Sequence, residues 1–261
     1  MKIALSIAGS DSGGGAGIQA DLKTFLQFGV HGTTAITALT AQNTLGVTGV
    51  HAVPAAFVSA QLAALLSDLP PDAVKTGMLA DASLVRIVAG VARERGWQHL
   101  VVDPVMVASA GDRLLTTDAE AVLRDELLPL AALVTPNLDE AEILLGTTVR
   151  DPAAMERAGR ALLELGARAA LIKGGHLAGD TVTDVLVLRD DVQRFTRPRI
   201  NVAGAHGTGC TLSAAITAGL ANGEPLPAAV EAGLRFVARA IESAPSLGRG
   251  HPPLNHGVAA V

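Results

Sequence analysis

Short apolar runs alternate with segments of helical periodicity from one end of the chain to the other. The apolar runs are rich in Val, Ile, Leu and Ala, and turn or polar residues bound them, which is typical of strands buried in a parallel sheet. The strands predicted in this way are Ile3–Ala8, Thr33–Leu39, Ala73–Lys75, Leu100–Asp103, Ala132–Thr135, Ala169–Lys173 and Val182–Leu188.

Helical segments lie between these strands. Apolar residues spaced at i, i+4, i+7 and i+8 predict one helix over 18–26, ended by Gly29, and two further helices over 212–220 and 230–241. Alternation of strands and helices predicts an α/β fold of three layers, a mostly parallel central sheet with helices on both faces. We expect a single domain that spans residues 1–261.

The composition narrows the function classes. Hydrophobic residues make up 49% of the 261 positions and charged residues 17%, which is ample for one large core. The formal net charge is −5 and no cluster of Lys or Arg occurs, so nucleic-acid binding is not expected. No apolar stretch approaches a membrane span of roughly 18 residues, and we expect a cytoplasmic protein. Cys210 is the single cysteine, which excludes an internal disulfide framework and a Cys-based zinc cluster.

The glycine-rich stretch "GSDSGGGAGIQAD" follows the first predicted strand and contains the pattern G-x-G-x-x-G/A in Gly15–Ala20. A dinucleotide site needs an acidic residue about 20 positions further on, yet no Asp or Glu occurs over 22–67. No Gly-Lys dipeptide occurs either, so a Walker A loop is absent from the sequence. Asp21 is either a charge favoured by the helix dipole or a carboxylate that faces a ligand pocket.

Polar residues stand where apolar strands stop. Asp103 ends one predicted strand, Asn137 and Glu140 follow another, and Lys173 ends a third. Ligands gather at the carboxyl ends of strands in such sheets, so Asp103, Asn137 and Glu140 are candidates to hold Mg²⁺, directly or through water. A helix cap and a solvated charge are the alternatives, and Glu142 is an equal candidate ligand. Lys173 suits a cation over phosphates, or is an exposed lysine at a strand end.

A second glycine loop lies near the C-terminus. Gly207, Thr208, Gly209 and Cys210 lead into the helix expected to begin around Thr211, which makes an anion site of backbone N–H groups. Cys210 is either a small buried hydrophobe or a thiol whose pKa the helix N-terminus lowers, giving a candidate base. An anion site, a base, a magnesium site and a lysine together indicate an ATP-dependent kinase without a P-loop.

The sequence resembles a known family in segments that cover nearly the whole chain. They are "IAGSDSGGGAGIQADLKTF", "TALTAQNTLGV", "VKTGML", "VVDPVMVASAGDRLL", "TPNLDEAEILLG", "LIKGGH", "HGTGCTLSAAI" and "GHPPLNH". Through them the chain is similar to the hydroxymethylpyrimidine/phosphomethylpyrimidine kinases of thiamine biosynthesis, in the ribokinase-like superfamily. The resemblance implies a ribokinase-like fold and ATP-dependent phosphorylation of 4-amino-5-hydroxymethyl-2-methylpyrimidine to its monophosphate and then to the diphosphate.

The resemblance also implies roles for residues on the acceptor side. Asp21 and Gln42 would hydrogen-bond the aminopyrimidine, and Gly9 and Met78 would pack near it. A carboxylate and an amide are able to read ring nitrogens and an exocyclic amine, and methionine offers an adaptable apolar wall.

On the phosphate side, the resemblance implies an anion hole of Gly207, Thr208 and Gly209. Cys210 takes the place of the aspartate that acts as base in most ribokinase-like enzymes. Lys173 and Thr208 would contact ATP, and ATP and Mg²⁺ are the implied cofactors. Family members are often dimers, so a homodimer is expected.

Two positions depart from the family pattern. Ser109-Ala110 stands where the family commonly has Lys-Ser, which removes a candidate phosphate contact, and Pro252 stands where glycine is expected. Two alternatives also stay open. One is a pyridoxal kinase, because pyridoxal is another ring with a hydroxymethyl group. The other is a non-catalytic pyrimidine sensor, against which the retained phosphate site argues.

Overall fold

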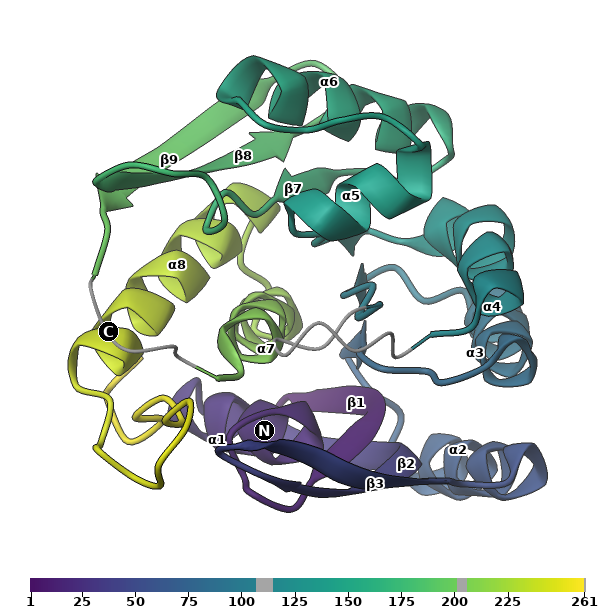
Figure 1. The fold of residues 1–261 in the computed structure, drawn as a ribbon. Coiled ribbons are helices and arrows are strands. Elements are labelled where there is room, and N and C mark those ends of the chain that lie inside the picture. The colour runs from purple at the N-terminus through teal and green to yellow at the C-terminus, as the bar shows by residue number, and fades with distance from the viewer. Residues whose placement is uncertain (107–114, 201–205, 261) are drawn as a thin grey trace.

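A nine-stranded sheet forms the centre of the protein (Figure 1). The structure is a computed structural model and describes residues 1–106, 115–200 and 206–260. The sheet order is β3-β2-β1-β4-β5-β6-β7-β8-β9. The strands are β1 (Ile3–Asp11), β2 (His31–Asn43), β3 (Gly46–Ala52), β4 (Ala73–Thr76), β5 (Leu100–Val102), β6 (Leu133–Val134), β7 (Ala170–Ile172), β8 (Thr181–Val187) and β9 (Val192–Pro198).

The six central strands of the sheet, β2, β1, β4, β5, β6 and β7, are parallel to one another. At the edges, β3 pairs antiparallel with β2, β8 with β7, and β9 with β8. All seven strands predicted from the sequence are present, with ends that differ by a few residues. The expectation of a mostly parallel sheet is therefore confirmed. The sequence analysis missed the edge strands β3 and β9, because few of their side chains are buried and neither has the continuous apolar run used to find the others.

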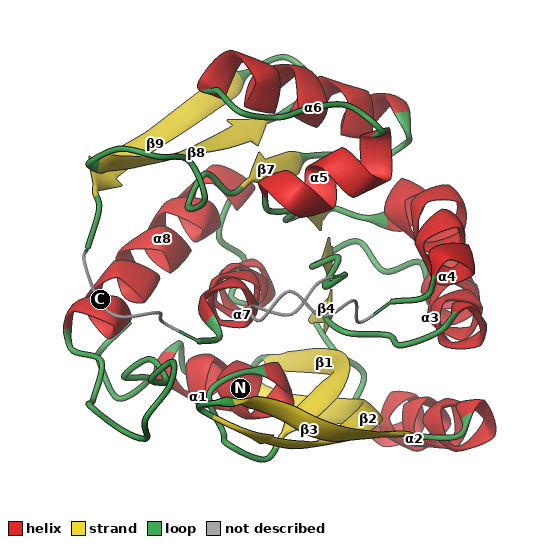
Figure 2. Cartoon of the chain, viewed as in Figure 1, coloured by secondary structure: helices red, strands yellow, loops and turns green. Residues whose placement is uncertain are grey.

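Helices cover both faces of the sheet (Figure 2). They are α1 (Gly17–Gln27), α2 (Ala55–Asp68), α3 (Ala82–Arg95), α4 (Thr117–Val122), α5 (Leu138–Leu145), α6 (Pro152–Glu164), α7 (Thr208–Ala221) and α8 (Leu226–Glu242). One hydrophobic cluster packs α2 to α6 against one face, and a second packs α1, α7 and α8 against the other. The three expected layers are thus present.

Helix α7 is the most enclosed helix of its face. Every residue over 211–221 is buried, and the helix packs between α1 and α8 against β1, β4 and β5. It begins at Thr208 and not around Thr211, so Thr208, Gly209 and Cys210 form its first turn. Their backbone N–H groups have no partner further back in the helix, which leaves them pointing out of its N-terminus.

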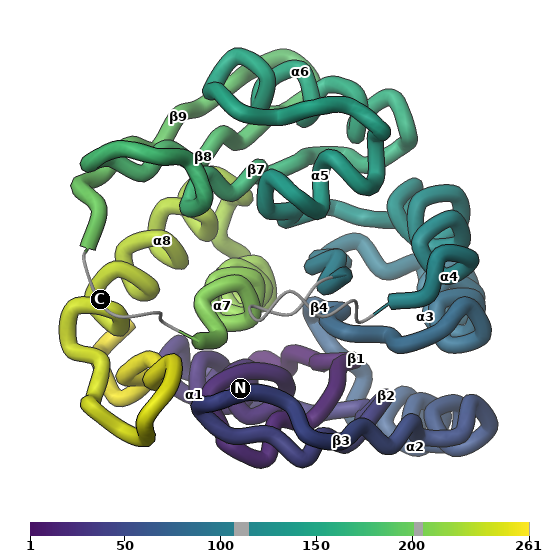
Figure 3. The backbone as a smooth tube through the Cα atoms, in the orientation of Figure 1, coloured from purple at the N-terminus to yellow at the C-terminus, as the bar shows by residue number. Residues whose placement is uncertain are grey.

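The chain after α8 returns to the glycine-rich loop (Figure 3). The backbone N–H of His251 donates to the carbonyl of Thr44 at 2.8 Å, and His206 pairs with Pro253 as an isolated bridge. His256, nearly buried, lies 2.9 Å from the hydroxyl of Thr211 in the first turns of α7. None of the helices in the described part of the chain is both long and apolar enough to cross a membrane.

Candidate active site

Lys173 lies at the centre of a cluster at the carboxyl ends of β5, β6 and β7. Its Nζ is 3.1 Å from Asp103 Oδ1 and 3.7 Å from Glu140 Oε2. A Cβ added to Gly209 would lie 3.2 Å from the same Nζ, so the lysine is also close to the N-terminus of α7. The structure therefore brings Asp103, Glu140, Lys173 and Gly209 together, from segments far apart in the sequence.

Opposite charges control ionisation in this cluster. Burial alone would lower the pKa of Lys173, but Asp103 and Glu140 raise it above its usual value. Burial alone would raise the pKa of Asp103, but Lys173 and Lys75 hold it below its usual value. The hydroxyls of Thr135 and Ser213 donate to the Asp103 carboxylate at 3.0 and 3.2 Å. The result is a fixed ammonium beside a fixed carboxylate.

Asn137 caps a helix, which was the alternative that the sequence left open. Its side chain accepts a hydrogen bond from the Glu140 N–H at 2.9 Å, and Glu140 Oε2 accepts one from the Asn137 N–H at 2.7 Å. This is a capping box at the start of α5, which occupies the Asn137 carbonyl. The amide oxygen keeps a second lone pair, so a role of Asn137 in holding Mg²⁺ stays a prediction. Burial raises the pKa of Glu140 to about 7.

The side chains around Lys173 suit a Mg²⁺ ion that is held mainly by water and substrate phosphates. Within residues 1–106, 115–200 and 206–260, no three His, Cys, Asp or Glu side chains are grouped closely enough to hold a metal ion. Two carboxylates, those of Asp103 and Glu140, face the common Lys173 ammonium. Mg²⁺ keeps several waters and is commonly held by one or two carboxylates together with substrate phosphates. The pair of carboxylates fits that arrangement.

Gly207 forms the turn into α7. It is the N-cap residue with φ +89°, in the left-handed region that glycine adopts readily. A Cβ at this position would collide with the carbonyl oxygen of Gly15 in the N-terminal glycine-rich loop. The two glycine loops recognised in the sequence are thus in direct contact, which no spacing argument indicated.

The thiol of Cys210 is not acidified as expected from its place at a helix N-terminus. Burial raises its pKa to about 11, nearby Asp21 and Asp103 oppose ionisation further, and Lys75 only partly offsets them. The helix effect is worth less than the removal of the thiolate from water. The expectation of a standing thiolate near neutral pH is therefore wrong.

Asp21 does not face an open pocket. It is fully buried, and Lys75 Nζ lies 2.9 Å from both of its carboxylate oxygens. The Ser6 hydroxyl donates to Oδ2 at 2.5 Å. Burial alone would lower the pKa of Lys75, but Asp21, Cys210 and Asp103 raise it above its usual value. Asp21 therefore forms a buried ion pair with Lys75, close enough to Cys210 to influence its ionisation.

Gly9 and Met78 are neighbours, as the expectation of a shared apolar wall requires. A Cβ at Gly9 would lie 2.7 Å from Met78 Cε, so the absence of a side chain makes room for the thioether. The Thr37 hydroxyl donates to the Met78 carbonyl at 2.6 Å and holds this segment against β2. Met78 and Gln42 are both partly exposed, which leaves them able to contact a ligand.

Two further residues were not singled out from the sequence. Asp11, at the end of β1, accepts hydrogen bonds from the N–H groups of Gly13, Gly15 and Ala16 at 2.8, 3.0 and 2.8 Å. Its Oδ2 also lies 3.1 Å from Nε2 of His206. The sequence signal was present, since Asp11 comes three residues after the apolar run Ile3–Ala8, but its partner lies 195 positions away.

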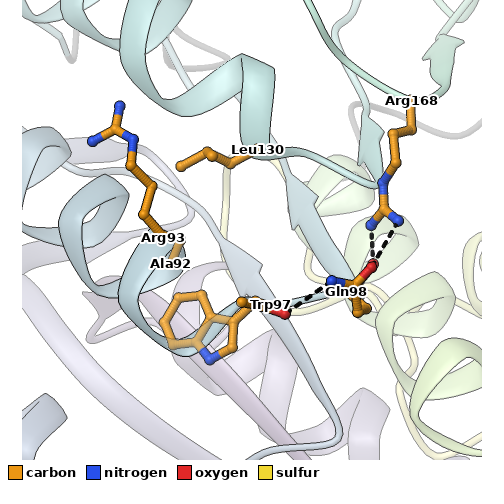
Figure 4. A pocket seen from close by; sticks show the side chains of 7 residues that line it. Ala92, Arg93, Trp97, Gln98, Leu130 and Arg168 are labelled. Carbon is orange, nitrogen blue, oxygen red and sulfur yellow. Dashed lines mark hydrogen bonds between the residues drawn. The ribbon is translucent and has the colours of Figure 1, made fainter.

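Two pockets lie at the amino ends of the strands, on the side of the sheet opposite to the Lys173 cluster. Arg93, Trp97, Gln98 and Arg168 line the first, which has a volume of about 400 Å³, and Trp97 and Gln98 also border the second. Figure 4 shows Arg168 directed at Gln98, to whose backbone carbonyl and side chain it donates. These residues precede β5 and β7 and so lie at the amino ends of the strands, away from Lys173. They carry no part of the cluster described above.

Comparison with known proteins identifies the family of this chain. A family model described as phosphomethylpyrimidine kinase matches residues 11–255. A hydroxymethylpyrimidine/phosphomethylpyrimidine kinase of Rhizobium meliloti is 53% identical over 97% of this chain and 96% of its own length. The thiamine biosynthesis bifunctional protein ThiED of Geobacter sulfurreducens is 52% identical over 98% of this chain, which spans 52% of that longer protein.

Solved structures also share the fold. The Bacillus subtilis pyridoxal kinase, in an ADP complex, has a TM-score of 0.92 at 37% identity and is covered over 98% of both chains. A Clostridium difficile phosphomethylpyrimidine kinase has a TM-score of 0.83 at 40% identity, over 92% of this chain and 100% of that one. The fold is ribokinase-like and the chain is a phosphotransferase. By the extent of the family match and the identity to its relatives, it belongs to the phosphomethylpyrimidine kinase family.

Proposed function

We propose that this kinase transfers the γ-phosphoryl group of ATP to the hydroxymethyl group of an aminopyrimidine, and then phosphorylates the monophosphate to the diphosphate. The observation that carries the proposal is the contact between the two glycine loops at Gly207 and Gly15. An acceptor bound at the N-terminal glycine-rich loop would then lie beside the N-terminus of α7, where phosphates bind well. Relatives at 46–53% identity carry the corresponding name.

On the donor side, the backbone N–H groups of Gly207, Thr208 and Gly209 would form the anion hole, and the N–H of Cys210 lies in the same first turn. Lys173 adds a permanent positive charge next to Gly209, which suits an ATP phosphate. Asp103 and Glu140 would hold Mg²⁺ through its water ligands, and that ion would neutralise phosphate charge. Phosphoryl transfer depends mainly on such positioning and charge neutralisation. The cluster supplies both.

On the acceptor side, Gln42 would hydrogen-bond the aminopyrimidine, and Gly9 and Met78 would pack against the ring. Asp21 takes a different part from direct contact, because Lys75 and Ser6 already occupy its carboxylate. We assign it instead to holding the Lys75 ammonium, whose charge acts on Cys210. Cys210 is the candidate base for the alcohol, which must lose a proton as it attacks, whereas a phosphate monoester is already anionic near pH 7.

A pyridoxal kinase is the second candidate. Pyridoxal kinases are among the most similar solved structures, and one from Staphylococcus aureus, in complex with AMP-PCP and pyridoxal, has a TM-score of 0.91 at 35% identity. Pyridoxal presents a hydroxymethyl group of the same kind to the phosphate site. The two candidates differ in the ring edge that the acceptor pocket must read.

The test is ADP release by the purified protein with Mg²⁺-ATP and, separately, hydroxymethylpyrimidine, its monophosphate and pyridoxal. Turnover of both pyrimidines is the expected result. Turnover of pyridoxal alone would replace the proposal with vitamin B6 salvage. Binding of the pyrimidine without any turnover would instead favour the sensor.

We also propose that the protein acts in the cytoplasm as a homodimer, on the strength of the family resemblance. Large apolar side chains are exposed near the β3 edge, among them Leu39 and Val50 at 47% and 56%. Sedimentation of the purified protein would give the expected mass of two chains, and the mass of one chain would contradict a dimer.

A further inference from the structure

His206 adjoins the anion hole in sequence and Gln42 in space. Its Nε2 lies 3.0 Å from Nε2 of Gln42 and 3.1 Å from Oδ2 of Asp11. The other end of the Gln42 amide, Oε1, lies 3.0 Å from the Thr40 hydroxyl, which is also 2.9 Å from the Ser10 carbonyl. The imidazole thus stands between a buried carboxylate and the amide expected to read the acceptor ring.

The number of donor hydrogens on His206, Gln42 and Thr40 decides which atom donates in each of these contacts. If Gln42 Nε2 donates to His206 Nε2, that nitrogen has no proton and its lone pair faces the Asp11 carboxylate. The two ends of a side-chain amide have nearly the same shape and can be exchanged. With the amide turned over, its NH₂ donates to Thr40, Thr40 donates to Ser10, and His206 Nε2–H donates to both Asp11 and the amide oxygen. Every contact is then satisfied.

Asp11 is able to fix this proton because it is itself fixed. Three backbone N–H groups of the glycine-rich loop donate to its carboxylate. Burial would raise the pKa of Asp11, but the hydrogen bonds from His206 and from the backbone of Ala16 and Gly13 lower it below its usual value. A carboxylate at this distance from Nε2 requires a proton on that nitrogen.

We propose that His206 is a positioning residue that sets the direction of the acceptor ring by fixing the orientation of the Gln42 amide. The amide then presents one free N–H and one free carbonyl lone pair in a defined order. An aminopyrimidine offers the matching edge, a ring nitrogen that accepts next to an amine that donates, as in bidentate amide recognition of adenine. This proposal rests on the proposed function.

The direction of the ring determines where its hydroxymethyl group points. A primary amide that is free to turn over would bind the same ring edge in either direction, and only one direction brings the hydroxyl toward Gly207 and its neighbours. His206 directly precedes Gly207, so the residue that fixes the ring is covalently joined to the loop that holds the phosphates. Fixing one relative to the other avoids non-productive binding.

The experiment compares turnover of the 4-amino ring with turnover of its 4-oxo analogue, in which the donor and acceptor positions of the edge are exchanged. We expect wild-type protein to favour the amino ring by more than about a hundredfold in kcat/KM, because a wrong edge leaves the amide unpaired. His206→Phe, which keeps the ring shape and removes the proton, should reduce this preference to within about tenfold. The KM for ATP should stay within about twofold in this variant, since the anion hole does not bond to the imidazole.

His206→Gln is the conservative variant, because its amide N–H can reach the place of the imidazole Nε2–H. It should restore the preference for the amino ring. His51→Phe, at an exposed position in β3, is the matched control and should leave the preference unchanged. In a Gln42→Ala background, His206→Phe should have little additional effect, because coupled residues are not additive.

Three results would overturn the inference: an unchanged preference in His206→Phe, additive losses in the double variant, or a raised KM for ATP as the sole effect. If His206→Phe does not fold, the comparison of His206→Gln with Gln42→Ala decides by the same ratio. Failure of wild-type protein to phosphorylate the amino ring would contradict the proposed function and not the role of His206. The two failures are therefore distinguishable.

Discussion

At the scale of single residues, burial determines what each charged group in the site is able to do. Lys75 and Asp21 have side chains with no exposed surface, yet they form an ion pair next to a thiol that burial keeps protonated. Removal of one partner from such a pair leaves a buried charge without compensation. The same residue types on the surface have little effect on stability.

Lys75→Met should therefore lower the free energy of unfolding by about 3–5 kcal/mol. Urea unfolding followed by circular dichroism would measure the loss. Lys2→Met is the matched control, because Lys2 makes a 2.8 Å ion pair with Asp72 but has a side chain that is 54% exposed. Its effect should stay within about 1 kcal/mol. Equal effects of the two substitutions would mean that the buried pair is not a structural anchor.

Cys210→Ala should slow phosphorylation of the alcohol by about tenfold or more and leave phosphorylation of the monophosphate within about threefold. The reason is that only the alcohol has a proton to lose. Single-turnover rates for each acceptor would measure the two steps separately. Equal losses in both steps would show that the thiol contributes packing and not proton transfer.

The pH dependence of the first phosphorylation step is a second test of Cys210 as the base. With a thiol pKa of about 11, the fraction of thiolate increases without a plateau across the neutral range. First-step kcat/KM should rise about tenfold per pH unit between pH 7 and pH 9 in the wild type, and this slope should be absent in Cys210→Ala. A plateau near neutral pH would mean that the bound substrates, or another group, supply the base.

At the scale of elements, α7 combines a rigid anchor with an exposed N-terminus. Its buried body is packed between α1 and α8, and its first turn directs N–H groups at the Lys173 cluster. Gly207 permits the close approach of this turn to the glycine-rich loop. A glycine of nearly the same φ, Gly223 with φ +87°, follows the other end of the helix in open space.

The pair Gly207→Ala and Gly223→Ala separates backbone strain from steric contact. Gly223→Ala should cost about 1 kcal/mol, the penalty for a side chain at positive φ. Gly207→Ala should cost more and should also raise the KM for ATP by about tenfold or more, because the new Cβ pushes the anion hole away from Gly15. Thermal unfolding and steady-state kinetics provide the two measurements. An unchanged KM for ATP in Gly207→Ala would mean that ATP binding does not depend on the contact between Gly207 and Gly15.

The elements that the sequence predicted are those whose burial leaves a periodic pattern. Continuous apolar runs identified the parallel strands, and helical spacing identified α1, α7 and α8. The same reasoning predicted that Asp103, Glu140 and Lys173 lie at one edge of the sheet, because the ends of parallel strands meet there. It could not find β3 and β9, whose residues are largely exposed and mixed in polarity.

The pairings inside the site were beyond the sequence for a different reason. Residue types and local spacing give no means of choosing Lys75 as the partner of Asp21, or His206 as the partner of Asp11. The acidity of Cys210 was misjudged because the local helix effect is visible in the sequence, whereas desolvation depends on everything packed around the thiol. The positions 109 and 110, where the family pattern is broken, lie outside the described residues.

At the scale of the whole molecule, the segment after α8 contacts both glycine loops of the site, the N-terminal one and the one that leads into α7. It contacts the β2–β3 turn through Thr44, the glycine-rich loop through Pro253 and the first turns of α7 through His256. Burial, with a smaller contribution from Lys23, lowers the pKa of His256 to about 4. The folded protein therefore holds this imidazole neutral.

The stability of the protein should reflect this histidine as pH falls. Above pH 6.5, the ordinary pKa of histidine, both folded and unfolded chains carry it neutral. As pH falls from 6.5 toward 4, the unfolded chain binds a proton that the folded chain does not, so up to about 3 kcal/mol of stability is lost. His256→Gln, which keeps an acceptor for Thr211 and does not titrate, should lack this component.

Urea unfolding of both proteins between about pH 7 and pH 5 would isolate the contribution of His256 as the difference between them. The difference should change with pH in the direction given, the wild type losing more than the variant on acidification. A difference independent of pH would mean that the histidine is protonated equally in both states.

The late position of α7 in the sequence has a consequence for biosynthesis. The strands that it covers, β1, β4 and β5, are all synthesised before residue 103, whereas α7 begins at Thr208. Their apolar face therefore waits for about 100 further residues to be translated, roughly 5–20 s at ordinary elongation rates. During that interval the nascent chain exposes the apolar surface that α7 will bury, which is the kind of surface that promotes aggregation. Because α7 both completes the core and carries the N–H groups for phosphate, the protein gains its core and its phosphate site at the same late stage of folding.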